Sequence, residues 1–244
     1  MPVDTFTAQV EAIRDLTHDV RQLDLRLHDT KTITFKAGQF ISFQVPHPRT
    51  GRLITRPYSI ASSPSRPEVI TLLFNLVPGG PGSAYLFSLK EGEGTRFKGP
   101  AGHFYLRDDP GRGLLFIATG TGIAPIRSMM FANAGRFDPR PTTLFWGLRS
   151  QRDLYYQEDL AELTRQMPTL EAITTLSRPD PGWSGESGRV LRLVEERIES
   201  VKNLAVYICG NSAMIADVTA LLRKKGLCPI YREQYYDDTA SPED

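Results

Sequence analysis

A short glycine-rich segment has the composition of a phosphate-binding loop. Gly120, Thr121 and Gly122 come directly after an apolar run, and Pro125 follows where a helix is expected to begin. Glycines let a backbone approach a pyrophosphate closely, and the free N–H groups at a helix start carry partial positive charge. Pro125 stands where a dinucleotide-binding fingerprint has its third glycine, and the next strand ends without a ribose-binding acid. The segment indicates a phosphate cradle, and a plain tight turn remains the alternative.

A second segment combines side chains that can bind a flat, charged cofactor. Arg56, Pro57, Tyr58 and Ser59 are consecutive. Arginine can pair with a phosphate through two hydrogen bonds, tyrosine can stack on a planar ring, and serine offers a small hydroxyl to a ring nitrogen. An edge strand that runs into a polar turn would show the same residues, so both interpretations stay open at this point.

A third segment, residues 78–86, is another glycine-rich loop that leads into a helix. It contains Gly80, Gly82 and Ser83, and we expect Ser83 to cap the helix. Such a loop can hold a second phosphate group, or it can serve only as a flexible connection.

Other kinds of reactive site have little support in the sequence. The two cysteines, Cys209 and Cys228, lie far apart and have no CxxC spacing or histidine pair beside them. Iron–sulfur clusters usually take four thiolates, and structural zinc takes four Cys or His ligands, so we expect no metal centre. No Ser/His/Asp order or paired-carboxylate cluster stands out, which argues against a hydrolase.

Composition limits the class of protein. The chain has 244 residues and a mass of 27.3 kDa, enough for one or two domains. Its formal net charge of +1 does not provide the basic footprint of a protein that binds nucleic acid. The amino-terminal residues lack a signal-peptide pattern, and no stretch is apolar enough for a membrane span. We therefore expect a cytoplasmic protein whose thiols are reduced.

The first half of the chain reads as antiparallel β-structure. Residues 23–27 and 41–45 alternate between apolar and polar side chains, which places one face of each strand in a core. Turn residues recur between such runs, a spacing that favours a small barrel or sandwich. One helix is expected in this half, at residues 83–89.

The pattern of apolar and polar residues changes after residues 108–113, where we place a linker. Continuous apolar runs, typical of strands covered on both faces, then alternate with helical patterns. The strands are expected at residues 114–118, 143–146, 170–176 and 204–209, and the helices around 126–134, 154–167, 190–200 and 212–225. This alternation predicts a parallel sheet with helices on both faces. We therefore predict two domains, an antiparallel β-barrel at residues 1–108 and an α/β domain at residues 114–244.

Together, the three segments resemble the ferredoxin:NADP reductase superfamily, over nearly the whole chain and in the family's order. The resemblance implies an FAD-binding barrel followed by a nicotinamide-binding α/β domain. It implies that Arg56 meets the FAD pyrophosphate, Tyr58 the isoalloxazine and ribityl region, and Ser59 the neighbourhood of the flavin N5 atom. The loop at residues 79–83 matches the second pyrophosphate-binding element, and residues 120–125 match the loop that binds the nicotinamide dinucleotide, its proline included.

Two further matches follow from this resemblance. Cys209 and Gly210 end the last long apolar strand and look like the family's Cys-Gly motif, whose cysteine lies beside the reacting nicotinamide carbon. Glu233 with Tyr235 or Tyr236 is similar to the closing segment, in which an acid and an aromatic lie near the flavin. A buried structural cysteine and surface packing of the tyrosines are the alternatives. The candidate catalytic residues are Ser59, Cys209 and Glu233.

The resemblance extends to residues that could distinguish NADP from NAD. A 2′-phosphate needs fixed positive charge and hydroxyl donors. Ser177 and Arg178 follow the third parallel strand and Arg189 follows the next loop, a pairing that resembles bacterial NADP-using members. Arg149 or Arg152 could add charge on the adenine side. We expect NADP, with NAD as the alternative because NAD-linked relatives can also carry a Ser-Arg-Pro run.

The activity that the resemblance implies is that of a flavoprotein oxidoreductase. It would pass a hydride between NADP(H) and FAD, and single electrons to or from a separate carrier, for which we expect ferredoxin or flavodoxin. The alternatives are an NADH-dependent reductase component of an oxygenase, a diaphorase that reduces free flavin or quinone, and a non-enzymatic docking subunit. The intact phosphate loops and Cys209 argue against the last of these. The sequence leaves the oligomeric state open.

Overall fold

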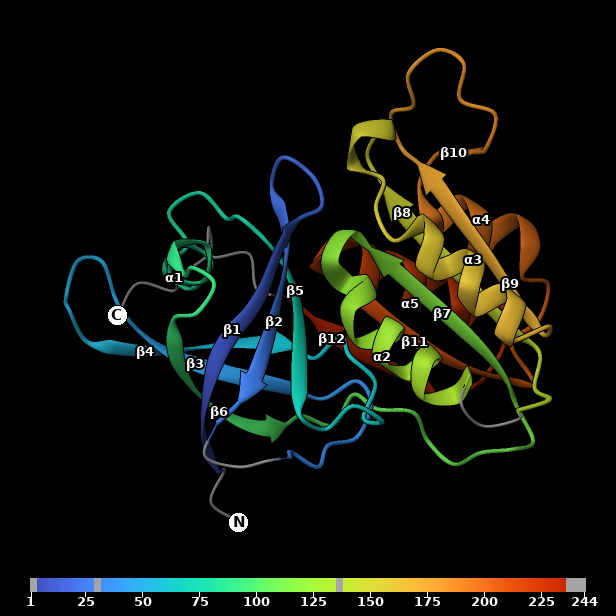
Figure 1. Cartoon of the computed structure of the whole chain (residues 1–244). Coiled ribbons are helices and arrows are strands. Elements are labelled where there is room, and N and C mark those ends of the chain that lie inside the picture. Colours follow the sequence, from blue (N-terminus) through green and yellow to red (C-terminus); the bar gives the residue numbers. More distant parts are fainter. Residues whose placement is uncertain (1–3, 29–31, 135–137, 236–244) are drawn as a thin grey trace. The chain divides into compact units, whose positions relative to one another are not determined.

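The chain forms two compact units, each with its own β-sheet (Figure 1). The computed structural model describes residues 4–28, 32–134 and 138–235. The described residues up to Leu106 form the first unit together with Arg127–Ala132, and the second unit consists of Arg107–Ile126 and the described residues from Asn133 to Tyr235. Among the described residues, no helix is both long enough and apolar enough to cross a membrane.

The first unit is a six-stranded antiparallel sheet with the strand order β4-β3-β6-β1-β2-β5. Ile60, directly after β4, forms an antiparallel bridge with Leu72 of β5, which joins the two edge strands and curls the sheet into a barrel. The elements are β1 (Thr5–Asp15), β2 (Val20–Leu27), β3 (Phe40–Pro46), β4 (Leu53–Ser59), β5 (Val69–Asn75), α1 (Pro81–Ser88) and β6 (Gly94–Ala101). The predicted antiparallel half is confirmed.

The alternating pattern of the sequence builds the core of this unit. In β3, Ile41, Phe43 and Val45 are buried, while Gln44 and Pro46 between and after them are exposed. Helix α1 adds the buried Leu86 to the same core. The helix begins two residues earlier than the predicted range of residues 83–89, because proline fits the first helical position, where no N–H partner exists.

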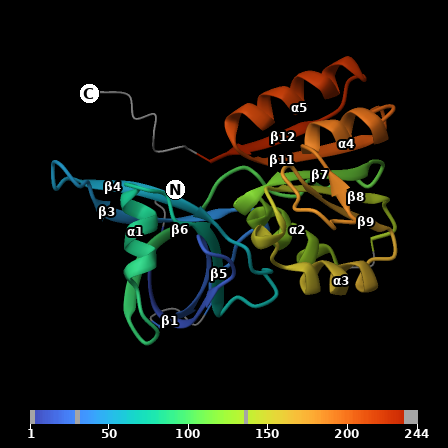
Figure 2. The ribbon, with the colours of Figure 1, turned by 90° about the horizontal axis from the view of Figure 1, so that it is seen from above.

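The second unit is a six-stranded sheet in the order β10-β9-β8-β7-β11-β12, and every pair in it is parallel. The elements from residue 107 onward are β7 (Gly113–Thr119), the 3-10 turn η1 (Gly120–Gly122), α2 (Ile123–Ala134), β8 (Thr142–Leu148), η2 (Gln151–Asp153), α3 (Gln157–Gln166), β9 (Leu170–Leu176), β10 (Glu186–Ser187), α4 (Val190–Arg197), β11 (Leu204–Gly210), α5 (Ser212–Lys224) and β12 (Ile230–Gln234). Of these, α2 is divided, because its residues Arg127–Ala132 belong to the first unit. Helices α4 and α5 cover one face and α3 lies on the other (Figure 2). The predicted parallel sheet with helices on both faces is confirmed.

The order of the parallel strands determines where this sheet can bind a ligand. The chain adds β8 and β9 on one side of β7 and later returns to add β11 on the other side. Loops diverge at the carboxyl ends of two strands where the order reverses, and open α/β sheets bind their ligands in the crevice there. In this sheet the position lies between the turn after β7 and the turn after β11.

A partly buried ion pair lies just before β8. Arg140 donates hydrogen bonds from Nε to Oδ1 of Asp138 at 3.0 Å and from Nη2 to Oδ2 at 2.6 Å, and the two side chains are 13% and 11% exposed. Arg140 also donates from Nη1 to the carbonyl oxygen of Asp109 at 3.0 Å, which fastens the linker to this strand. The hydrogen bonds from Arg140 lower the pKa of Asp138 to about 2.

The pKa of Asp138 predicts a loss of stability in acid. A carboxyl group whose pKa is lower in the folded than in the unfolded protein stabilises the fold above its unfolded pKa, and this contribution disappears between about pH 4 and pH 2. The free energy of unfolding is measured with urea at pH 5 and at pH 2. Its loss between these two pH values should be about 1–2 kcal/mol smaller in Asp138→Asn than in the unmodified protein. Asp217→Asn, which changes an exposed carboxylate on α5, is the control. A pH dependence unchanged by Asp138→Asn would contradict the assignment.

Candidate functional site

Two of the sequence segments meet in the first unit. Arg56 and Tyr58 lie on β4, opposite Phe43 and Ile41 of β3, so both side chains extend from the same face of the strand. Gly82, in the first turn of α1, packs against both of them. A Cβ atom on Gly82 would lie 2.5 Å from the Tyr58 hydroxyl oxygen and 2.9 Å from Cβ of Arg56. Only glycine therefore fits at this position, where the helix start meets the strand.

The first turn of α1 offers hydrogen-bond donors beside a cation. The N–H groups of Gly82 and Ser83 lie at the second and third helical positions, where an α-helix has no internal acceptor. Both residues are buried, and Arg56 adjoins Gly82. Backbone donors, a helix dipole and a guanidinium together form a site that suits a phosphate group.

Ser83 has a different role from the predicted one. The N-cap residue is Gly80, so the expectation that Ser83 caps the helix is wrong. Because Pro81 starts the helix, Ser83 is the third residue of its first turn and not the residue before it. Its Oγ accepts a hydrogen bond from the N–H of Val77 at 3.0 Å and donates to the carbonyl oxygen of Gly80 at 3.1 Å. Ser83 thereby fixes the shape of the glycine-rich loop before the helix.

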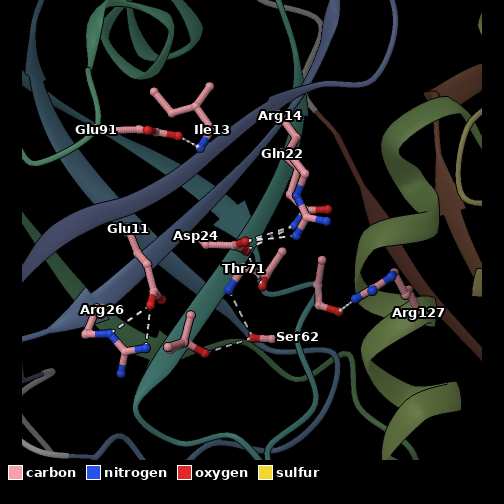
Figure 3. Close-up of polar contacts among 12 residues, drawn as sticks. Glu11, Ile13, Arg14, Gln22, Asp24, Arg26, Ser62, Thr71, Glu91 and Arg127 are labelled. Atoms are coloured by element: carbon pink, nitrogen blue, oxygen red, sulfur yellow. Dashed lines mark hydrogen bonds and ion pairs between the residues drawn. The ribbon is translucent and has the colours of Figure 1, made fainter.

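Ser59 is buried. Hydrogen bonds hold the residues shortly after it, around Ser62 (Figure 3). The Oγ atom of Ser62 accepts from the N–H of Thr71 at 3.0 Å, and the hydroxyl of Thr71 donates to Oδ1 of Asp24 at 2.6 Å. Arg127 donates from Nη1 to the carbonyl oxygen of Ala61 at 2.8 Å. This support fixes the backbone directly beyond residues 56–59.

Sequence reasoning missed two residues of this support, both on α2. Arg127 bonds Ala61 as described, and Ser128, which is fully buried, donates from Oγ to the carbonyl oxygen of Ser62 at 2.6 Å. Both bonds are accepted by main-chain carbonyl oxygens. Every residue type has such an oxygen, so the sequence does not indicate which residues Arg127 and Ser128 contact. The helical pattern predicted α2 but not the residues that its side chains reach.

The second unit places the Gly120 segment at the position where the strand order reverses. Gly120 has a positive φ of 51°, and the 3-10 turn Gly120–Gly122 leads directly into α2. Pro125 lies in the first turn of α2, where a missing N–H costs nothing. This position explains the proline that replaces a third glycine. The N–H of the Trp146 indole ring donates to the carbonyl oxygen of Gly120 at 3.0 Å and holds the turn.

Two glycines allow the turns after β7 and β11 to touch. A Cβ atom on Gly122 would collide with the carbonyl oxygen of Cys209, and one on Gly210 would collide with Oγ1 of Thr119. Gly210 also has a positive φ of 150°. The hydroxyl of Thr119 accepts hydrogen bonds from the N–H and side-chain amide of Asn211, at 3.5 and 3.4 Å. The segments around Gly120 and Cys209 therefore form one site, and Thr119 is a member that the sequence did not reveal.

Cys209 lies beside the closing segment in this site. It is paired in register with Glu233 of β12, and the N–H of Tyr235 donates to the carbonyl oxygen of Gly210 at 3.2 Å. Burial, reinforced by the charge of Glu233, raises the pKa of the Cys209 thiol well above its usual range, and a hydrogen bond from Tyr235 only partly opposes this shift. The thiol is therefore protonated at neutral pH and is not a thiolate nucleophile.

The structure distinguishes the two closing tyrosines. The hydroxyl of Tyr235 donates to the carbonyl oxygen of Thr121 at 3.3 Å, so this ring lies between the turn after β7 and the strand that carries Cys209. Tyr236 lies outside the described residues. Among the described residues, no three His, Cys, Asp or Glu side chains are grouped so that they could hold a metal ion.

Basic side chains collect further along the same edge of the sheet. The N–H of Ser177 donates to the carbonyl oxygen of Leu148 at 3.0 Å, and the N–H of Arg178 to that of Arg149 at 2.7 Å. Arg189 is the N-cap residue of α4 and follows Gly188, whose N–H donates to the carbonyl oxygen of Leu176. The side chains of all three arginines are exposed and form no ion pair with a described carboxylate. They offer positive charge to an anionic ligand.

Comparisons with known proteins agree with this division. Residues 7–105 match the family described as "Oxidoreductase FAD-binding domain", and residues 116–220 match "Oxidoreductase NAD-binding domain". The chain is 36% identical over 228 residues to "Ferredoxin--NADP reductase B" of Sorangium cellulosum, covering 90% of this chain and 92% of that protein. It is 31% identical to the phenol 2-monooxygenase reductase component DmpP of Pseudomonas sp., covering 96% of this chain and 67% of that protein.

Solved structures show the same fold. The cytochrome P450 reductase GcoB of Amycolatopsis superimposes with a TM-score of 0.85 at 28% identity, covering 96% of this chain and 70% of that one.

The contact between Gly122 and Cys209 predicts a specific cost of substitution. In Gly122→Ala, the added methyl group forces the turn after β7 away from β11, and overpacking of this kind costs about 2 kcal/mol. The melting temperature, measured by calorimetry, should fall by about 5 °C. Gly111→Ala is the control, since a Cβ there meets its first neighbour, Oδ1 of Asp109, only at 3.8 Å. Equal melting temperatures for the two variants would contradict the described packing.

Proposed function

The chain belongs to the ferredoxin reductase-like superfamily of FAD-dependent NAD(P)H oxidoreductases, and on that premise we propose that it transfers reducing equivalents between NADP(H) and a one-electron carrier protein. The carrier that we propose is a ferredoxin or a flavodoxin. We assign FAD to residues 1–108 and NADP to residues 114–244.

One observation carries this proposal: the chain has two separate phosphate cradles on two different sheets. One is the start of α1 beside Arg56, and the other is the turn Gly120–Gly122 beside Gly210. Each is a helix start that glycine opens to a close backbone approach. Two such sites suit two dinucleotides, whereas an enzyme with a single nucleotide needs only one.

The residues of the first unit fit FAD. Arg56 pairs with the pyrophosphate, and the first turn of α1 donates N–H groups to the same anion. Tyr58, already packed edge-on against Phe43 at a centroid distance of 5.9 Å, supports the flavin and ribityl region. Ser59 would offer its hydroxyl to the flavin ring. When bound, FAD supplies the conversion between hydride transfer and single-electron transfer.

The residues of the second unit fit a nicotinamide dinucleotide. The turn Gly120–Gly122 and the start of α2 hold its pyrophosphate. Cys209, a protonated and buried thiol, would give the nicotinamide a compact, uncharged neighbour. Glu233 lies next to Cys209 in the sheet and Tyr235 covers the same place. None of these groups is required as a strong base, because hydride transfer needs orientation rather than proton removal.

Exposed arginines support NADP as the nucleotide. Arg178 and Arg149 are adjacent through their backbones, and Arg189 begins α4 near the end of β9. With the Ser177 hydroxyl, they provide charge and donors for a 2′-phosphate.

A second candidate function has direct support among the relatives. Several of them are reductase components of oxygenase systems, such as DmpP and the naphthalene 1,2-dioxygenase reductase component described as ferredoxin--NAD(P)(+), of which this chain covers 67% and 70%. The alternative is therefore an NADH-dependent reductase component, or a diaphorase acting on free flavin or quinone.

Flavin content and its reduction test the proposed function. The purified protein should be yellow, and anaerobic NADPH should bleach its visible flavin absorbance. Arg56→Ala should raise the dissociation constant of FAD by about 10- to 100-fold, the cost of one charge-assisted phosphate contact. Arg66→Ala, an exposed arginine of the same unit, is the control. A colourless protein that takes up no FAD would refute the assignment.

The choice of nucleotide is tested with the arginines of the second unit. Arg178→Ala and Arg189→Ala should each raise the KM for NADPH about 10-fold or more and leave the KM for NADH unchanged, because only NADPH carries the 2′-phosphate. Arg223→Ala, in the last turn of α5, serves as the control. Equal efficiency of NADH and NADPH in the unmodified protein would instead favour the oxygenase-reductase alternative.

A further inference from the structure

The loop between β9 and β10 carries two residues that the proposed function assigns to a 2′-phosphate. We call residues 177–185 the β9–β10 loop, which is drawn in orange near β10 (Figure 1). It begins with Ser177 and Arg178, and Arg189 follows shortly after β10. Both arginines are exposed, and an exposed side chain loses conformational freedom when it binds an anion. The backbone that carries these arginines therefore affects how strongly they bind.

The pairing of β9 with β10 places the two arginines at equivalent positions. The strands are parallel, and their last paired residues are Leu176 and Ser187. Arg178 and Arg189 each lie two residues beyond this pair. Because neighbouring strands are about 5 Å apart, both arginines leave the same edge of the sheet from adjacent strands. They are therefore in a position to bind one anionic group together.

A tight turn shapes the middle of the β9–β10 loop. The N–H of Trp183 donates to the carbonyl oxygen of Asp180 at 3.3 Å, and Gly182 has a positive φ of 91°. Residues 180–183 have proline second and glycine third, which is typical of a type II turn. The indole N–H of Trp183 donates to the carbonyl oxygen of Glu186 at 2.9 Å, which joins this turn to the start of β10.

Gln151, in the 3-10 turn η2 after β8, holds the same turn from outside the loop. Its Nε2 atom donates to the carbonyl oxygen of Asp180 at 3.1 Å, and its Oε1 atom accepts from the N–H of Asp180 at 2.8 Å. Both polar atoms of the amide are thus bonded to the backbone of a single residue, which fixes its position and orientation. Asp180 lies two residues after Arg178, so Gln151 holds the backbone that carries this arginine.

Thr175 has the corresponding role on the other side of the loop. Its side chain is fully buried, and its hydroxyl donates to the carbonyl oxygen of Gly188 at 2.9 Å. The N–H of Gly188 donates to the carbonyl oxygen of Leu176 at 2.7 Å, so both main-chain polar groups of this glycine are bonded to β9. Gly188 has a positive φ of 107° and is followed directly by Arg189. Thr175 therefore holds the backbone just before the second arginine.

We propose that Gln151 and Thr175 are positioning residues that set the preference for NADP over NAD, an inference that rests on the proposed function. Gln151 holds the backbone of Arg178 and Thr175 holds that of Arg189, so that both guanidinium groups are in place before a 2′-phosphate arrives. We call these bonds the loop framework. Preorganised groups bind more tightly because less freedom is lost on binding. NAD has no 2′-phosphate, so its binding does not depend on the loop framework.

Adenosine 2′,5′-bisphosphate and 5′-AMP test this proposal, because they differ only in the 2′-phosphate. Calorimetric titration of the purified holoprotein measures both dissociation constants. Gln151→Met and Thr175→Val keep the approximate size of each side chain and remove its hydrogen bonds. Each should raise the dissociation constant of the bisphosphate about 5-fold or more and leave that of 5′-AMP unchanged. The KM for NADPH should rise equally, with kcat and the KM for NADH unchanged.

Double variants show whether each residue acts through its arginine. Gln151→Met should have no further effect on bisphosphate binding in Arg178→Ala, and Thr175→Val should have none in Arg189→Ala. Thr175→Ser, which keeps the hydroxyl, should bind the bisphosphate as the unmodified protein does. Gln151 is only half-buried, so Gln151→Met tests the proposal even if the buried change Thr175→Val prevents folding.

Two variants on α3 serve as matched controls. Gln166→Met removes a side-chain hydrogen bond to Glu162, and Thr164→Val removes one to the carbonyl oxygen of Leu160. Neither variant should change the affinity for either nucleotide.

The outcomes separate this inference from the proposed function. An unmodified protein that binds the bisphosphate no more tightly than 5′-AMP would refute the assignment of NADP, and the inference with it. A clear preference for the bisphosphate that survives both Gln151→Met and Thr175→Val would leave the assignment of NADP intact and overturn the inference. Equal weakening of both nucleotides, or effects that persist in full in the arginine variants, would overturn the inference as well.

Discussion

The nucleotide-binding half of this protein depends on direct backbone contact between two turns. Gly122 touches the carbonyl of Cys209, and Gly210 touches Thr119, so no side chain fits between the ends of β7 and β11. This contact brings a helix start, a thiol and the closing strand β12 to one place. Everything assigned to the nicotinamide follows from it, because a parallel sheet leaves its ligand only this opening. In the barrel, Gly82 likewise lets the start of α1 pack closely against Arg56 and Tyr58 of β4.

Much of the architecture could be read from the sequence, for identifiable reasons. Alternation in residues 41–45 and the unbroken apolar run at residues 114–118 distinguish a half-exposed from a fully covered strand, which separates the antiparallel from the parallel sheet. The two glycine-rich turns before α1 and α2 could be located because glycine and proline change the freedom of the backbone itself. The predicted start of α1, at Ser83, was two residues too late, because both serine and proline are common at helix starts. Ser83 is a good cap by type, but Pro81 comes earlier and fixes the first turn.

Contacts from side chains to backbone were the part that the sequence did not show. Ser128 and Arg127 bond carbonyl oxygens of Ser62 and Ala61, and any residues could supply those acceptors. The loop framework between β9 and β10 was hidden in the same way, because it too consists of bonds to main-chain atoms. Only the pairing of β9 with β10 shows that two arginines separated in the sequence follow the same position of neighbouring strands.

The burial of Cys209 affects how readily this cysteine is oxidised. Flavoproteins work amid oxidants, and peroxide attacks cysteine through the thiolate, progressing to acids that no cell readily reverses. Enclosed between the sheet and Tyr235, and held in the protonated form, Cys209 presents little of that reactive species. The arrangement would let a sulfur atom lie in the site proposed for the nicotinamide while remaining chemically inert.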